Sequence, residues 1–156
     1  MHRRTLIAFG ATSLALPRAF AHHGWSSFDQ DRPIYLEGKV VKVAWRNPHA
    51  ELEIELAADL KLPADLARRA VPAQAAAVDS ARLLGAAVLP TRRDKIWEIE
   101  LAPLTRMEAW KVPEVKVGET VSVLGFTLIG EKGEAVVRAE YLFAGGKAYG
   151  LRSSPA

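Results

Sequence analysis

The sequence predicts a mainly β fold: a small barrel of five to six strands with a helical insertion between the second and third strands. Three observations lead to this prediction. Short segments alternate between apolar and polar residues, two of them slip by one residue in their alternation, and an alanine-rich stretch bounded by prolines separates two of them. A slip inside a strand indicates a β-bulge, which bends the strand and helps a small sheet to close. The pattern is more typical of an OB-like (oligonucleotide/oligosaccharide-binding) barrel than of a sandwich, although that name describes a shape and not a ligand.

The first strand is expected in "IYLEGKVVKVAW", residues 34–45. Two sets of residues alternate in it, Leu36, Gly38 and Val40 and then Val41, Val43 and Trp45. The period of two therefore slips at Val40–Val41, which predicts a bulge. Pro48 ends the strand because it cannot donate a ladder hydrogen bond.

The second and third strands follow in "HAELEIELA" (49–57) and "KIWEIELA" (95–102). Their inward residues are Ala50, Leu52, Ile54 and Leu56 and then Trp97, Ile99 and Leu101, which leaves His49, Glu51, Glu53, Glu55, Glu98 and Glu100 outward. Like charges directly opposed across two strands are unfavourable. The sequence therefore predicts that Lys39, Lys42 and Lys95 neutralise this surface, and a hard cation is the alternative.

The later strands are expected within 115–130 and 134–151, the first with a turn at 116–119 and a slip near Leu124–Gly125, the second with a Gly145–Gly146 hairpin. Between strands, residues 101–113 predict a loop and helix whose Met107 and Trp110 plug one barrel end. One core is expected from Val43, Leu52, Ile54, Trp97, Ile99, Val121, Val123 and Tyr141.

Residues 58–94 differ in composition from the strands around them. Alanine is frequent, and Pro63, Pro72 and Pro90 bound stretches with helix-compatible spacing. This predicts one or two helices, with a start after Pro72 and a weak far end at Gly85.

The chain opens with the features of a secretory signal: Arg3 and Arg4, an apolar run, and then Ala19-Phe20-Ala21. Cleavage after Ala21 would make His22 the first residue of a periplasmic protein. The paired arginines and the mild apolar run suit the twin-arginine route, and an ordinary signal fits equally well. Residues 22–151 are then one barrel domain and 152–156 a tail, with no membrane-spanning segment in the mature chain.

Removing residues 1–21 changes the charge. The loss of Arg3, Arg4 and Arg18 takes Lys and Arg from 21 to 18, equal to the 18 Asp and Glu, so the mature chain lacks the basic footprint of a nucleic-acid-binding protein. With no cysteine, disulfides, thiolate metal sites and thiol catalysis are excluded. No nucleophile-elbow, Walker or dinucleotide-binding motif occurs.

The stretches "AHHGWSSFDQDRPIYLEGKVVKVAWRNPHAELEIEL", "WEIELAPLTRME" and "VKVGETVSVLGF" resemble the domain-of-unknown-function 6152 family of small exported bacterial proteins. Its members run from a signal peptide into a His-His pair and then a G-x-V-x-x-V-x-W-x-N-P-H strand and turn. The resemblance implies the barrel and the export, and it implies no particular chemistry.

Three histidines remain after cleavage: His22 and His23 at the new terminus, and His49 after the Pro48 turn. A terminal histidine can chelate through its amine and its imidazole, and a further imidazole completes a nitrogen set that suits Cu(II). The alternative is that the pair forms a polar leader, while His49 caps a turn.

Two classes of function follow. The first is a periplasmic binding or accessory module that handles copper or serves a periplasmic or membrane-bound protein partner. The second is a metal-dependent enzyme, for which Glu51, Glu108 and Asp29 are the available acids or bases and none stands out. The binding module is therefore favoured, and a structural or protein-interaction barrel without metal stays open.

Overall fold

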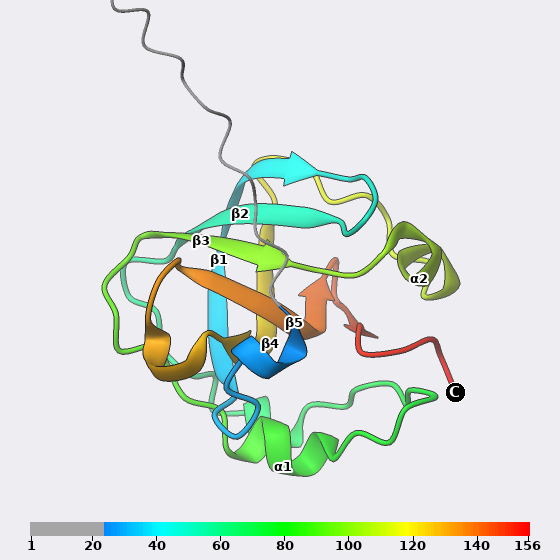
Figure 1. Cartoon of the computed structure of the whole chain (residues 1–156), viewed down its shortest axis with the longest axis horizontal. Coiled ribbons are helices and arrows are strands. Elements are labelled where there is room, and N and C mark those ends of the chain that lie inside the picture. The colour runs from blue at the N-terminus through cyan, green and yellow to red at the C-terminus, as the bar shows by residue number, and fades with distance from the viewer. Residues whose placement is uncertain (1–23) are drawn as a thin grey trace, which may run out of the picture.

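The computed structural model describes residues 24–156 as one six-stranded sheet with short helices around it (Figure 1). The strands are β1 (Ile34–Ala44), β2 (Glu51–Leu56), β3 (Ile96–Glu100), β4 (Thr120–Thr127), β5 (Val136–Ala144) and β6 (Lys147–Gly150). The α-helices are α1 (Ser80–Gly85) and α2 (Leu104–Ala109), and the 3₁₀ turns are η1 (Trp25–Ser27), η2 (Leu66–Arg68) and η3 (Ile129–Glu131).

The sheet closes on itself. Its strand order is β3-β2-β1-β4-β5-β6, and a parallel pairing of β3 with β5 joins the first strand of this order to the fifth. Five strands thus form a closed barrel, and β6 extends it as an antiparallel addition to β5. The prediction of a small, mainly β barrel is confirmed.

The pairing register shifts at both predicted slips, at the first through a bulge in β1 and at the second through a bulge in the partner strand of β4. In the β1–β2 pair the register shifts between Val40 and Lys42, and Val41 is left 39% exposed. In the β4–β5 pair Leu124 faces Tyr141 while Gly125 faces Ala139, so the extra residue lies on β5 and is Glu140. A side chain at position 125 would place its Cβ 2.3 Å from the carbonyl oxygen of Arg138, so the strands can approach this closely only at glycine.

The molecule has two apolar clusters. The inner cluster fills the barrel and contains Leu52, Ile54, Trp97, Ile99, Val121 and Val123, as predicted, with Val43 partly buried against it. The outer cluster lies on the opposite face of β1, β4 and β5 and contains Phe28, Tyr35, Leu66, Leu83, Leu84, Leu124, Phe126 and Tyr141. The assignment of Tyr141 to the barrel core is therefore wrong, because β5 is buried on both faces and Tyr141 belongs to the second.

The insertion supplies the cover for this second face. Its only α-helix in the described chain, α1, begins at Ser80, where the Asp79 side chain accepts a hydrogen bond from the Arg82 amide at 3.0 Å. The expected helix start after Pro72 is wrong, and most of residues 58–94 is irregular. The insertion is held on the barrel wall by three buried leucines, Leu66, Leu83 and Leu84.

The predicted plug is confirmed at α2. Met107 is 1% exposed within the inner cluster, and Trp110 packs against that cluster while its Nε1 donates to the Ser153 carbonyl at 2.8 Å. Residues 152–156, expected to be a tail, lie against the insertion through the Gln74–Pro155 bridge. No helix within residues 24–156 has the length and apolar character needed to cross a membrane.

Candidate functional site

Trp25, the second of the described residues, has two arginine side chains next to its ring. The guanidinium carbon of Arg138 lies 5.0 Å from the Trp25 ring centroid, and that of Arg152 lies 4.1 Å from it. Arg138 also lies 4.5 Å from the Phe28 ring. Cations at these distances are attracted to an aromatic face. Since Arg138 belongs to β5, η1 is fixed against the outer face of that strand (Figure 1).

Buried carboxylates hold both arginines in place. Glu100, 7% exposed, accepts from Arg138 Nε at 2.8 Å and from Nη2 at 2.6 Å. Glu140 is fully buried and accepts from Arg152 Nε at 2.7 Å and from Gln74 Nε2 at 3.0 Å. The bulge residue of β5 therefore connects the C-terminal segment and the insertion to the barrel, and through Arg152 it supports Trp25.

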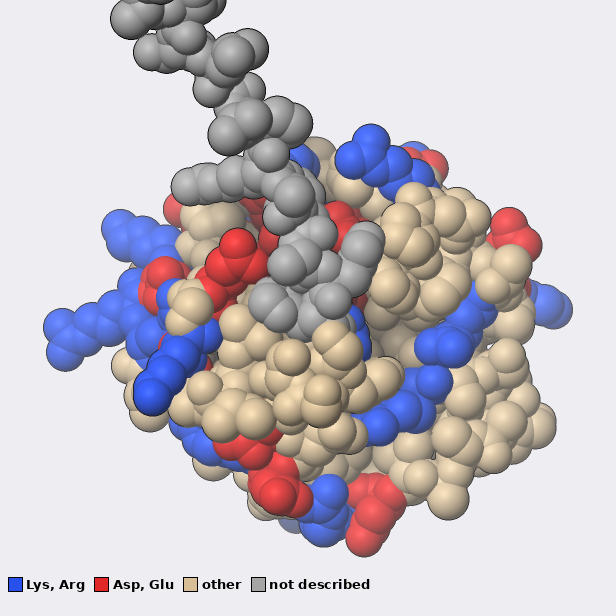
Figure 2. All heavy atoms as spheres, in the orientation of Figure 1, with Lys and Arg blue, Asp and Glu red and all other residues tan. Residues whose placement is uncertain are grey.

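Glutamates face one another across β2 and β3. Glu51 is opposite Glu100, and Glu53 is opposite Glu98. Figure 2 shows acidic side chains gathered over these two strands. Such pairs repel unless they are neutralised.

Neutralisation is partial. Lys42 forms the predicted ion pair with Glu53, and Arg138 neutralises Glu100. Within residues 24–156 neither Lys39 nor Lys95 takes part in an ion pair, so the predicted role of those two lysines is wrong. Glu100 is also not a solvent-facing residue as predicted, because β5 covers it.

Burial and the incomplete neutralisation together raise the pKa of Glu98. Burial first, and then the charges of Glu51, Glu100, Glu134 and Glu53, raise the pKa of Glu98 from an ordinary value of 4.5 to about 7. In the folded protein it is therefore partly protonated near neutral pH, whereas in the unfolded chain it is ionised.

We expect Glu98→Gln to stabilise the protein above pH 7. The folded-state pKa is the higher one, so folding stability falls as pH rises from about 4.5 to about 7, and the full penalty is present above that range. Glu98 is half-buried and solvent screens the repulsion, so we expect a gain of about 1–2 kcal/mol at pH 8 and none at pH 4. Urea unfolding across this pH range measures it. Exposed Glu55, which faces Ile96, gives the control Glu55→Gln, and equal gains in both variants would contradict the assignment.

His49 lies at the start of this acidic surface. It is half-buried, precedes Glu51 by two residues, and so continues the same outward parity. The loop before it is tied to α2 by Asn47, whose Oδ1 accepts from the Leu104 amide at 3.3 Å. His22 and His23, the other two predicted ligands, lie outside the described residues. Among residues 24–156 no group of three or more His, Asp or Glu has metal-binding geometry.

The two arginines around Trp25 were missed by sequence reasoning. A signal existed in "VVRAEYL", where Arg138 and Glu140 interrupt an otherwise apolar strand, because charged residues inside a strand that is buried on both faces need partners. Arg152 gave no such signal, since it follows the last strand.

Comparison with known proteins gives a match to a family model that covers the first part of the chain. Residues 11–61 match DUF6152, described as a family of unknown function. This match covers about a third of the chain, and over that part the chain is similar to the DUF6152 family. The matched part contains His22, His23 and His49 and runs through Trp25, β1 and β2. It stops shortly after the insertion begins, so most of the insertion lies beyond the DUF6152 match. No curated protein and no solved structure gives a significant match.

Proposed function

We propose that this protein is an exported binding module whose mature chain begins at His22 and binds Cu(II). The ligands are the amine and imidazole of His22, with His49 and His23 completing the set. The observation that supports it is the clamping of Trp25, because this fixes the barrel-bound end of the leader on a particular face.

Only residues 22–24, the leader, precede Trp25 in the mature chain, so the fixed position of Trp25 limits how far away His22 can lie. His22 precedes Trp25 by three residues, so its Cα lies within roughly 11 Å of the Trp25 Cα. Contacts lead from there toward His49. Arg138, beneath the Trp25 ring, bonds Glu100, and Glu100 is the cross-strand neighbour of Glu51. His49 lies two residues before Glu51, about 7 Å away along extended backbone. We propose that residues 22–24 follow this path, so that His22 and His49 bind one Cu(II) together.

The chemistry of the donors favours copper. Imidazole and a deprotonated amine are nitrogen ligands, and Cu(II) prefers such ligands in a tetragonal arrangement. The surrounding carboxylates add negative charge that favours a divalent cation. We favour binding over catalysis because Glu51 lies on β2, Glu108 on α2 and Asp29 in the segment before β1, so no two of these acids belong to the same element.

The first requirement is the processed terminus. We expect the exported protein to begin at His22, since Ala19-Phe20-Ala21 supplies the small residues before the cut. Intact mass measurement of protein recovered from the periplasm checks this. A start at Gly24 or later would remove both leading histidines and end the copper proposal.

The second requirement is the free amine. We expect protein beginning at His22 to bind one Cu(II) tightly, and the same chain with a methionine before His22 to bind at least tenfold more weakly, because the chelate ring through the amine is lost. Titration with a competing chelator measures both affinities. The control is Glu108→Ala on α2, which should bind as the unmodified protein does. Equal affinity with and without the added methionine would show that the amine is not a ligand.

A further inference from the structure

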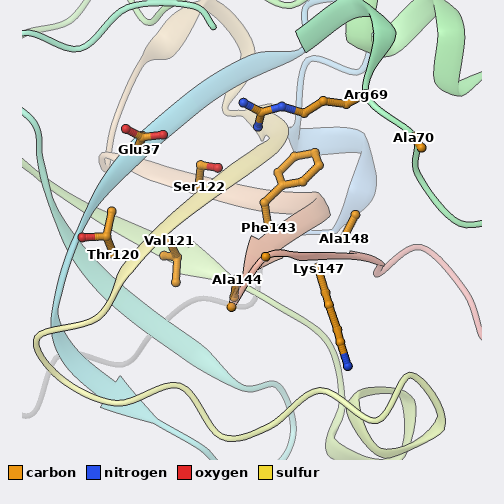
Figure 3. A pocket seen from close by; sticks show the side chains of 12 residues that line it. Glu37, Arg69, Ala70, Thr120, Val121, Ser122, Phe143, Ala144, Lys147 and Ala148 are labelled. Atoms are coloured by element: carbon orange, nitrogen blue, oxygen red, sulfur yellow. The ribbon is translucent and has the colours of Figure 1, made fainter. Parts of the chain in front are cut away.

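A separate pocket of about 380 Å³ lies on the outer face of the sheet, between the insertion and the β5–β6 hairpin (Figure 3). Its floor is one row of cross-strand neighbours on β1, β4, β5 and β6, namely Glu37, Ser122, Phe143 and Ala148. Arg69 of the insertion extends over this row. Four strands and the insertion therefore build one hollow.

Two cationic residues, Arg69 and Lys147, line this pocket, and Arg69 is fixed in position. Arg69 bonds Asp65 through Nε at 3.1 Å and Nη2 at 3.3 Å, and its guanidinium carbon lies 5.2 Å from the Phe143 ring centroid. Asp65 is its one ion-pair partner within residues 24–156, so the edge that carries Nη1 is not committed to a carboxylate. A planar cation held in this way loses little freedom when a ligand carboxylate binds.

The carboxylate of the pocket, Glu37, has one oxygen in a hydrogen bond within the described residues and one that accepts none there. The Tyr35 hydroxyl donates to Glu37 Oε2 at 2.7 Å, while within residues 24–156 Oε1 accepts no hydrogen bond and Glu37 joins no ion pair. Ser122, 7% exposed and opposite Glu37 on β4, adds a hydroxyl that can donate or accept. A fixed cation and a carboxylate thus face one small space above an aromatic ring.

We propose that this pocket binds a small zwitterion of the amino-acid class. The ligand carboxylate pairs with Arg69, its ammonium group pairs with Glu37, and its carbon chain lies on Phe143. A volume of about 380 Å³ falls at the lower end of the range of small-molecule pockets, which suits a ligand of this size. The proposal is independent of the copper site.

The test is a titration of the full mature chain with glycine, β-alanine and γ-aminobutyrate, which separate the two charges by increasing lengths. We expect saturable amide NMR shifts at Arg69, Ser122 and Phe143 for at least one of them. Glu37→Gln and Arg69→Gln should each weaken binding about tenfold or more, since each removes a charged hydrogen bond. Arg68→Gln is the matched control, because Arg68 is exposed and does not line the pocket, and it should bind as the unmodified protein does.

Three results would overturn the proposal: no saturable shift with any zwitterion, acetate or methylammonium binding as tightly as the zwitterions, or Arg68→Gln weakening binding as much as Arg69→Gln. Glu37→Gln keeps an acceptor for the Tyr35 hydroxyl, so it tests the charge in a folded protein. Ala70→Trp gives a second variant that fills the pocket without removing a charge, and it should abolish the shifts.

Discussion

Replacing Glu140 with alanine is expected to lower the free energy of unfolding by about 3–5 kcal/mol. The carboxylate is fully buried and accepts hydrogen bonds from Arg152 and from Gln74. Its removal takes the buried acceptor from the Gln74 amide and the carboxylate partner from Arg152, which keeps its bond to Gln30, and the loss of such a partner is costly. Urea denaturation followed by tryptophan fluorescence measures the loss.

The loss of Glu140 should also change the surroundings of Trp25. Arg152 lies over the Trp25 ring, so we expect Glu140→Ala to change the fluorescence of the folded state as well as its stability. Glu119→Ala, at an exposed position in the turn before β4, is the control and should change stability by less than about 0.5 kcal/mol. A loss below about 1 kcal/mol in Glu140→Ala would mean that the pair with Arg152 contributes little to the fold.

Truncating Ile54 to alanine is expected to cost about 2–5 kcal/mol. Ile54 has no exposed surface, sits in the inner cluster and faces Trp97 across β2 and β3. The same truncation at Ile96, on the adjoining strand but 43% exposed, should cost less than about 1 kcal/mol. Thermal and urea unfolding of the two variants tests the strand parity directly. Similar losses at both positions, or the larger loss at Ile96, would contradict the assignment of the inner face.

The barrel could be predicted because the alternation of apolar and polar residues can be read within each strand separately. Alternation places Ile54 and Ile99 inward whatever they contact, and the slip at Val40–Val41 reports a bulge within one strand. The place of Tyr141 could not be predicted in this way. Alternation distinguishes two faces of a strand, and it does not say that the second face is also covered.

The insertion shows how packing overrides helix propensity. Alanines between Pro63 and Pro90 favour helix, and yet the helix that forms there spans only Ser80–Gly85. Burial of Leu66, Leu83 and Leu84 against the outer face of the barrel requires a path that a longer helix would not follow. The capping residue Asp79 was a usable local signal, and it marks the true helix start.

The candidate site was only partly predictable. Sequence reasoning selected His49 from its parity and from the Pro48 turn before it, and in the structure it is half-buried and lies two residues before the first residue of β2. The anchoring of Trp25 depends on Arg138 and Arg152, which are 113 and 127 residues further along the chain. Contacts between segments so distant leave no periodic trace in the sequence.

The measurement that tests the central claim most directly is the electron paramagnetic resonance spectrum of Cu(II) bound to protein beginning at His22, compared with the same protein carrying His49→Ala. If His49 is a ligand, the variant should show one fewer coordinated imidazole nitrogen in its superhyperfine and pulsed spectra, with weaker copper binding. Identical spectra and affinities in the two proteins would contradict the site, because they would show that copper is held by the leader alone and that the fixed position of Trp25 on the barrel has no part in binding.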